Sequence, residues 1–330
     1  ETGAVRFAPG VDASVLSWAE EEILVLVPSG GDGGSFRVET SLGLLSKPYP
    51  FILATPDEVT LNLLQSVIFT PSCALGSCHG AALAAGKILR DRADDIGKVS
   101  FKEFNDPVTE VDLLAEKTVI ERIKKTFPDH DILAEESGNS EGSHSTSKWI
   151  IDPLDGTLNY SHGYPCYCVS IALEQEGEVK VGVIYNPCLD ELFVAEKGQG
   201  AILNGKPIHV SSISTLKKSL LVTGFAPRVV MSENDNLDHF CNFMKACQAV
   251  RRPGSAAMDL VYTAMGRFEG FWERMLHPWD VGAGLLIVLE AGGKASKFDG
   301  SPTNIYDQEI IVSNGLVHQE MVDVLQKGKV

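Results

Sequence analysis

Two carboxylates three positions apart, Asp152 and Asp155, are the strongest candidates in this chain for ligand binding and chemistry. They follow the apolar residues 149–151, a run that predicts a short buried strand ending at the acidic pair. Carboxylates held this close repel each other unless positive charge lies between them, and oxygen ligands favour a hard cation such as Mg²⁺. The alternative interpretation is a capped strand-to-helix turn, in which Asp-Gly-Thr is an ordinary sequence.

Further polar groups lie beside this pair or at the ends of other predicted elements. Gly156 would let another group approach the backbone closely, and Thr157 adds a hydroxyl. Because Asp112 lies three residues after Thr109, the spacing predicts a capping box, and a plain helix-dipole acid is the alternative to a metal role. The other acidic residues at element ends are Glu135, Glu136 and Asp280.

Composition excludes some classes of function. With 330 residues, 44% of them hydrophobic, the chain can bury a substantial core and hold one large domain or two. Its formal net charge of −16 argues against nucleic-acid binding, which needs clusters of Lys and Arg. Small phosphorylated substrates stay compatible with this charge, since bound metal ions can reverse the field locally. No apolar run approaches the ~20 residues of a membrane span, so we expect no membrane partner.

The seven cysteines lack the spacing of zinc or thioredoxin motifs. Cys166 and Cys168 alternate along a strand-like run, and we interpret them as small core residues of a protein in a reducing compartment. We therefore expect a soluble protein of the cytoplasm or of an organelle stroma or matrix.

Residues 1–70 contain no motif that assigns a role. Strands are predicted at 23–27 and 36–40, joined as a hairpin, and a helix is predicted to begin at 55–58. The first residue is Glu, which indicates a processed or truncated product, and the acidic surplus is unlike a typical organelle transit peptide. We interpret this segment as an N-terminal extension of unknown role that could be poorly ordered.

After residue 70 the patterns predict helices and strands in irregular alternation. Helices are predicted over 73–94, from Thr109 onward, over 255–265, and from Asp280 to the glycines at 292–293. Strands are predicted at 132–134, 167–173, 179–185, 191–195, 220–223 and 268–273, and a polar loop at 138–147. Without a regular βαβ rhythm, these elements favour a layered α+β architecture.

Two motifs together resemble the signatures of the inositol monophosphatase family. They are Asp-Pro-Leu-Asp-Gly-Thr at 152–157, and Trp-Asp-Val-Gly-Ala-Gly at 279–284 followed by Glu-Ala-Gly-Gly at 290–293. The resemblance runs from about Leu75 to about Leu325 and implies one phosphatase domain over 71–330. It implies the five-layer αβαβα sandwich of metal-dependent sugar phosphatases and Mg²⁺-dependent hydrolysis of a small polyol phosphate, with myo-inositol monophosphate favoured.

The resemblance also implies roles for particular residues. Two or three Mg²⁺ ions are expected, the first held by Glu135, Asp152 and the carbonyl of Leu154, the second by Asp152, Asp155 and Asp280. Asp112 would reach metal through water, and Glu135 with Thr157 would orient and deprotonate the attacking water. The N–H groups of Gly156 and Thr157 would bind phosphate. The alcohol part would contact Glu273, Ser255, Ala256 and Asp155.

Several alternatives remain open from sequence. Histidinol phosphate, fructose 1,6-bisphosphate and phosphoadenosine phosphate are the other candidate substrates within the superfamily. A regulatory or binding homologue without turnover is the alternative from another class, although the proposed catalytic residues are all present. Family members commonly form homodimers, and the apolar run at 167–173 could contribute to such an interface.

Overall fold

The computed structural model describes residues 72–103, 106–140, 146–226 and 235–327, together with five short strands before residue 52. The chain divides into two compact units, Glu1–Thr70 and Pro71–Val330. Each unit is described by itself.

The described part of the first unit consists of two small sheets. A three-stranded antiparallel sheet has the order β1 (Ala4–Phe7), β4 (Gly34–Glu39) and β5 (Tyr49–Phe51), and β2 (Ser14–Trp18) pairs with β3 (Ile23–Leu26).

The strands predicted at 23–27 and 36–40 are therefore present, but the hairpin predicted between them is wrong. β3 pairs with β2, and β4 pairs with β1. The connection from β2 to β3 is shorter than that from β3 to β4, so pairing β3 with β2 closes a smaller loop at less entropic cost. The helix predicted to begin at 55–58 lies outside the described residues.

The second unit contains a large sheet whose central strands are buried on both faces. Its eight strands are antiparallel to their neighbours except for the parallel pair β8 and β10. In sheet order they are β15 (Lys206–Ile208), β14 (Ala201–Leu203), β13 (Glu191–Glu196), β12 (Glu178–Asn186), β11 (Cys168–Gln175), β10 (Ser147–Asp155), β8 (Asp131–Ala134) and β9 (Gly138–Ser140). β9 begins within the segment predicted as a loop at 138–147, and that part of the prediction is wrong because the segment pairs with β8.

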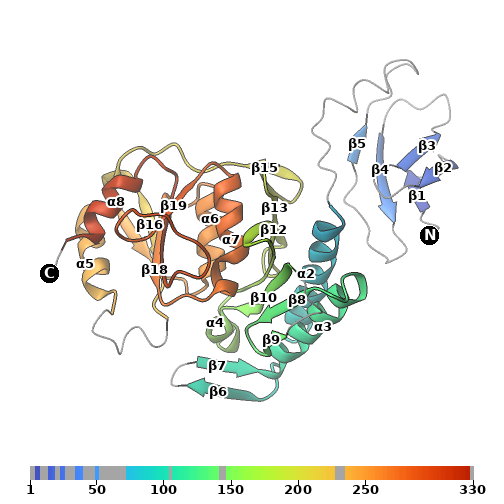
Figure 1. Ribbon diagram of the computed structural model, residues 1–330, viewed down its shortest axis with the longest axis horizontal. Coiled ribbons are helices and arrows are strands. Elements are labelled where there is room, and N and C mark those ends of the chain that lie inside the picture. Colours follow the sequence, from blue (N-terminus) through green and yellow to red (C-terminus); the bar gives the residue numbers. More distant parts are fainter. Residues whose placement is uncertain are drawn as a thin grey trace. The chain divides into compact units, whose positions relative to one another are not determined.

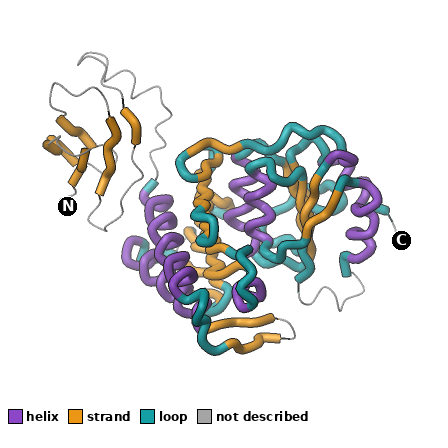
Figure 2. The backbone as a smooth tube through the Cα atoms, turned by 180° about the vertical axis from the view of Figure 1, so that it is seen from behind, coloured by secondary structure: helices purple, strands orange, loops and turns teal. Residues whose placement is uncertain are grey.

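Helices cover both faces of this large sheet (Figures 1 and 2). α2 (Cys73–Asp91) and α3 (Glu110–Thr126) pack on one face, and α7 (Pro278–Glu290), which packs beside α6 (Ala256–Ala264), lies on the other. The apolar run at the start of β10, Trp149 to Ile151, is at most 1% exposed because it is enclosed from both sides.

A smaller sheet lies on the far side of α6 and α7. Its order is β17 (Ala249–Arg251), β16 (Leu220–Thr223), β18 (Gly270–Arg274), β20 (Glu309–Ser313) and β19 (Lys294–Ser296). The outer helices are α5 (Leu237–Ala246), which contacts β17, and α8 (His318–Leu325), which contacts β20. The second unit is thus an α+β protein with five layers in the order αβαβα, as predicted (Figure 1).

Local signals set the starts of two helices that matter for the site. Thr109 and Asp112 form the predicted capping box of α3, and Ser255 caps α6 by accepting from the N–H of Met258. α7 begins at Pro278, so Asp280 lies in its first turn. Before α3, β6 (Val99–Glu103) and β7 (Asp106–Thr109) form a two-stranded hairpin.

The strand predicted to contribute to a dimer interface is an interior element. Residues 167–173 are at most 6% exposed within a single chain, with the side chains of β11 enclosed by α2 and α7. Their apolar character is therefore explained by the core, and their side chains are not available to a second copy.

Candidate active site

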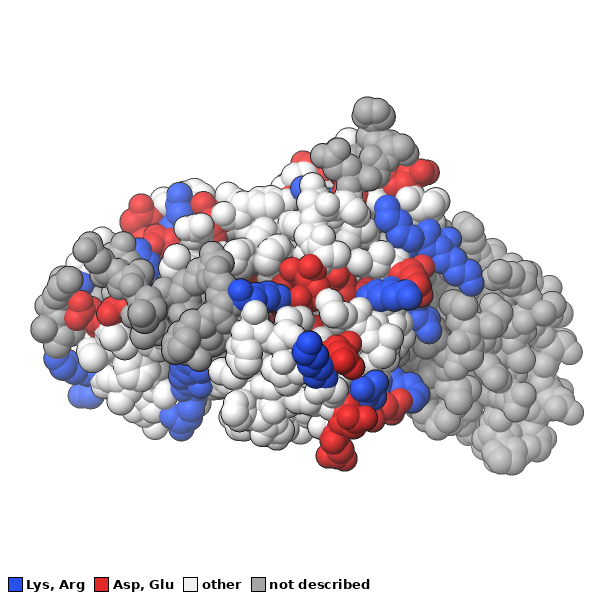
Figure 3. Space-filling model, turned by 90° about the horizontal axis from the view of Figure 1, so that it is seen from below, with Lys and Arg blue, Asp and Glu red and all other residues white. Residues whose placement is uncertain are grey.

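Three carboxylates converge from two layers of the fold. One oxygen each of Asp152, Asp155 and Asp280 lies within 4.8 Å of the others. The first two come from the end of β10 and the third from the first turn of α7, which packs against β10. Figure 3 shows acidic side chains gathered on this side of the molecule, with Lys and Arg on either side of them.

Asp155 is held by the N-terminus of α6. Its Oδ2 accepts from Ser255 Oγ at 2.5 Å and from the N–H of Ala257 at 2.7 Å. The predicted substrate residues Ser255 and Ala256 therefore begin a helix that directly contacts one of the predicted metal ligands. The thiol of Cys168 lies 3.9 Å from the same oxygen, buried as the sequence predicted.

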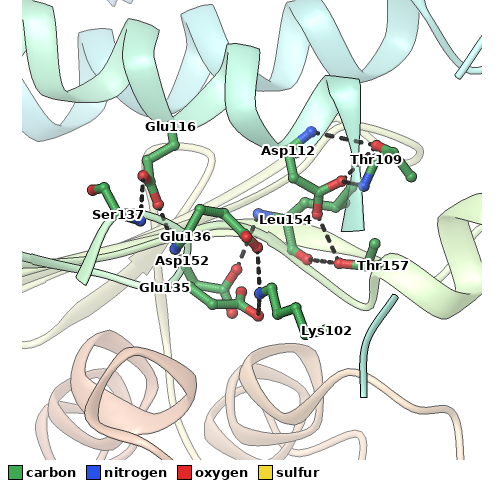
Figure 4. A network of polar contacts seen from close by, with 10 residues as sticks. All are labelled: Lys102, Thr109, Asp112, Glu116, Glu135, Glu136, Ser137, Asp152, Leu154 and Thr157. Atoms are coloured by element: carbon green, nitrogen blue, oxygen red, sulfur yellow. Dashed lines mark hydrogen bonds and ion pairs between the residues drawn. The ribbon is translucent and has the colours of Figure 1, made fainter. Parts of the chain in front are cut away.

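Glu135 lies in the turn immediately after β8, and its N–H donates to the carbonyl of Ile151 at 3.1 Å. The Nζ of Lys102 lies 3.0 Å from one oxygen of Glu135 and 2.6 Å from one of Glu136 (Figure 4). Lys102 comes from β6, so the β6–β7 hairpin reaches the site through this ion pair. Sequence reasoning missed this contact, since a single lysine in an unremarkable segment carries no motif.

A hydrogen-bonded chain links the end of β10 to α3 (Figure 4). The Thr157 hydroxyl is within donating distance of Asp112 Oδ1, at 2.8 Å, and of the Leu154 carbonyl, at 3.0 Å. Thr109 donates to the other oxygen of Asp112 from both its hydroxyl and its N–H. The partner of Thr157 is thus Asp112, a pairing that the sequence did not indicate.

The predicted metal ligands carry strongly perturbed pKa values. Burial and the charges of Glu135, Asp155 and Asp280 raise the pKa of Asp152 well above its usual range. Burial likewise raises the pKa of Asp280 and that of Glu135, and it raises the pKa of Asp155 to about 6. Buried carboxylates that repel one another need cationic compensation, and their all-oxygen donor set fits hard divalent ions. The residues present therefore fit Mg²⁺.

Two further buried acids, Glu273 and Asp259, interact electrostatically with Asp155. Burial and the charge of Asp155 raise the pKa of Glu273, which is 5% exposed, to about 8. Burial, Glu273 and Asp155 raise the pKa of Asp259 well above its usual range. Within the described part of the chain, neither carboxylate oxygen of Asp259 has a hydrogen-bond partner. Asp259 was not among the predicted site residues, although a single acidic residue within the apolar segment 256–264 is visible in the sequence.

Gly156 occupies a position that only glycine fits without strain. Its φ is 99°, and a Cβ there would come within 2.9 Å of the Cys166 carbonyl. This backbone conformation turns the chain from β10 into α4 (Thr157–Ser161) and places Thr157 beside Asp112.

The five-layer fold and its carboxylate cluster define a class of phosphoric monoester hydrolases. Residues 74–328 match the Inositol monophosphatase family, and the chain belongs to that family.

Known relatives align with about three quarters of this chain and with most of their own length. The Synechocystis protein named Inositol-1-monophosphatase is 45% identical over 265 residues, 79% of this chain and 92% of the relative. The Nus factor SuhB of Escherichia coli K12 is 40% identical over 244 residues, 73% of this chain and 91% of the relative. The solved inositol monophosphatase of Anabaena sp. PCC 7120 is similar with a TM-score of 0.70 at 45% identity, covering 76% and 94% of the two chains.

Among the residues that the structure describes, none of the helices is long and apolar enough to cross a membrane.

Proposed function

We propose that this chain hydrolyses the phosphate monoester of a small polyol, with myo-inositol monophosphate as the favoured substrate. The observation that carries the proposal is the convergence of Asp152, Asp155 and Asp280 within 4.8 Å. The name Inositol-1-monophosphatase of the Synechocystis relative supports the choice of substrate.

We assign the metal ligands as the family resemblance implies. Glu135, Asp152 and the Leu154 carbonyl would hold one Mg²⁺, and Asp152, Asp155 and Asp280 would hold a second. The proposal allows a third Mg²⁺ ion in the same site. When bound, divalent ions offset the charge of the ester and make water more acidic.

The chain's own residues would position and deprotonate the attacking water. Glu135 acts as general base, with its carboxylate accepting the proton. When the Thr157 hydroxyl donates to Asp112 Oδ1, the lone pairs of its oxygen can accept a hydrogen bond from water. Asp112 thereby sets which way the hydroxyl points. The N–H groups of Gly156 and Thr157 would bind the phosphate oxygens.

The polyol would be recognised by carboxylates. Glu273 and Asp155 are acceptors when ionised, and hydroxyl groups are matching donors. Ser255 and Ala256 lie at the start of α6 beside Asp155 and would line the same part of the site.

Phosphate-release assays with Mg²⁺ test the substrate. The panel contains myo-inositol monophosphate, histidinol phosphate, fructose 1,6-bisphosphate and phosphoadenosine phosphate, with Asp280→Asn as the inactive control. We expect the highest kcat/KM with the inositol ester. Activity confined to the nucleotide, or to either of the other two esters, would overturn the choice of substrate.

A second candidate is a regulatory role without turnover, motivated by the similarity to a Nus factor. The intact set of Glu135, Asp152, Asp155, Thr157 and Asp280 argues for catalysis. Purified protein that binds Mg²⁺ and inorganic phosphate but hydrolyses no ester of the panel would favour this second candidate.

We further propose that residues 71–330 are the phosphatase domain and residues 1–70 an extension. The match over 74–328 and the division of the chain near residue 70 support this assignment. Equal kcat/KM for the full chain and for residues 71–330 would be consistent with it, and loss of activity on truncation would contradict it.

We also propose a homodimer in a reducing compartment. The seven cysteines are all free thiols, as a reducing environment requires. A sedimentation mass equal to one 35.6 kDa chain at micromolar concentration would contradict the dimer.

A further inference from the structure

We propose that Glu116, on α3, is a positioning residue that fixes the orientation of Glu135. The inference rests on the proposed function, in which Glu135 binds metal and accepts a proton. Glu116 is 4% exposed, and its two carboxylate oxygens accept from the N–H groups of the two residues that follow Glu135. The distances are 2.8 Å from Oε2 to Glu136 N and 2.9 Å from Oε1 to Ser137 N (Figure 4).

A carboxylate matches this turn for a specific chemical reason. The N–H groups of Glu136 and Ser137 are both directed at the carboxylate of Glu116, whose two oxygens give each of them an acceptor of its own. Hydrogen bonds to an ionised acceptor are about twice as strong as neutral ones. The two N–H groups in turn compensate the buried charge of Glu116, which would be costly if unpaired.

The turn is thereby held on both sides of the Glu135 side chain. The N–H of Glu135 is bonded to the Ile151 carbonyl on β10, and the next two N–H groups are bonded to Glu116. With three consecutive N–H groups fixed, the backbone of the turn, and with it the direction of the Cα–Cβ bond of Glu135, is set before any ligand arrives. The ion pair with Lys102 acts only at the tip of that side chain.

Helix α3 contacts both segments that carry the proposed water-activating residues, Thr157 and Glu135. Asp112 and Glu116 are four residues apart, so they lie on the same face of the helix. Asp112 contacts Thr157 at the end of β10, and Glu116 holds the turn after β8. One rigid helix therefore sets the separation between Thr157 and Glu135, a spacing that a water molecule between them requires.

The test variant is Glu116→Gln, which keeps the shape of the side chain. The NH₂ group of the glutamine would face the backbone N–H of either Glu136 or Ser137. One hydrogen bond is then lost, and two hydrogen-bond donors point at each other. We expect kcat and Mg²⁺ affinity to fall by roughly 10–100-fold, the usual effect of changing a residue that supports a metal ligand. KM for the ester should change little, because the proposed polyol contacts are on other elements.

Glu121→Gln is the matched control, since it removes a carboxylate from the same helix. Glu121 is exposed and pairs only loosely with Lys117, at 3.9 Å, so kcat and Mg²⁺ affinity should stay at the wild-type values.

Amide hydrogen exchange tests the two hydrogen bonds from Glu136 and Ser137 to Glu116 without relying on turnover. In the wild-type protein the amides of Glu136 and Ser137 should be protected, and in Glu116→Gln they should exchange faster, while the amide of Glu135 stays protected by Ile151. Wild-type amides that exchange as freely as an open loop would overturn the proposal, even if the variant fails to fold. Wild-type kcat and Mg²⁺ affinity in a folded Glu116→Gln protein would also overturn it. If the wild-type protein hydrolyses no ester, the proposed function fails, while exchange and Mg²⁺ titration still decide the role of Glu116.

Discussion

The Thr157 hydroxyl lies 2.8 Å from Oδ1 of Asp112, a single hydrogen bond that joins the end of β10 to the first turn of α3. Asp112 is fully buried, and burial raises its pKa while the bonds from Thr109 and Thr157 lower it. Because Thr109 occupies Oδ2, Oδ1 is the oxygen that directs the Thr157 hydroxyl. The relation makes Thr157 a candidate for orienting water, and that role can be separated from metal binding.

Thr157→Val should reduce kcat by roughly 10²–10⁴, the usual span for a positioned acid–base group, because only the hydroxyl is removed. Mg²⁺ affinity should persist, since all proposed metal ligands remain. Calorimetric Mg²⁺ titrations beside initial rates at saturating substrate measure both quantities. Thr157→Ser keeps a hydroxyl and should retain most of the activity. Near-normal turnover of a folded valine variant would remove Thr157 from the mechanism.

Asp155→Asn should weaken Mg²⁺ binding and nearly abolish turnover. The amide can still accept from Ser255 and Ala257, so local structure should be retained while one negative charge is lost. Circular dichroism checks the fold, and calorimetry checks the affinity. Asp94→Asn removes an exposed carboxylate far from α6 in sequence and should leave both unchanged. Equal Mg²⁺ affinity in wild type and Asp155→Asn would contradict the ligand assignment.

The metal-free protein should lose stability as the pH rises. The pKa of Glu273 is raised to about 8 in the folded state, so between its unfolded value and pH 8 the folded chain binds more protons. The free energy of unfolding therefore falls through this window. Below the unfolded pKa of about 4.3, Glu273 is protonated in both states, so burying it carries no charge penalty. Above pH 8 it is ionised in both states, and the full cost of burying its charge lowers the free energy of unfolding. At about 1.4 kcal/mol per pKa unit, a rise from about 4.3 to about 8 corresponds to a penalty of about 5 kcal/mol.

The measurement is the free energy of unfolding in EDTA between about pH 5 and about pH 9, for wild type and Glu273→Gln. The neutral glutamine should make the decline with pH shallower. Parallel curves for the two proteins would show that Glu273 is not the group responsible.

Gly224→Ala should impair recognition of the polyol. A Cβ at Gly224 would overlap the carboxylate of Glu273, which must then move. Leaving one buried hydrogen-bonding group without its partner costs about 1–3 kcal/mol, or roughly 5–100-fold in kcat/KM for the inositol ester. Hydrolysis of p-nitrophenyl phosphate, which lacks the polyol, should change little.

Gly76→Ala is the control for this glycine substitution, because a Cβ at Gly76 meets nothing within 4 Å. Its kinetics should match wild type. An unchanged kcat/KM for the inositol ester in Gly224→Ala would argue that Glu273 does not contact the polyol.

Local features of the site could be predicted from the sequence because they depend on neighbouring residues. The capping box of Thr109 and Asp112 follows from a spacing of three residues, and the cap at Ser255 follows from a serine just before a helical segment; both are present. The buried strand before Asp152 follows from an unbroken apolar run. The five-layer fold followed from the paired motifs and the irregular order of elements.

Contacts between layers were decided only by the tertiary structure. The family resemblance implied that Thr157 acts with Glu135 on water, and the packing of α3 against β10 adds Asp112 as the hydrogen-bond partner of the Thr157 hydroxyl. Neither Lys102 nor Glu116 carried a motif, because their roles depend on N–H groups and carboxylates that lie 20 to 34 residues away. A hydrogen bond requires atoms within about 3 Å, and spacing in sequence determines such distances only within one element. Between elements, the packing of side chains in the core determines them.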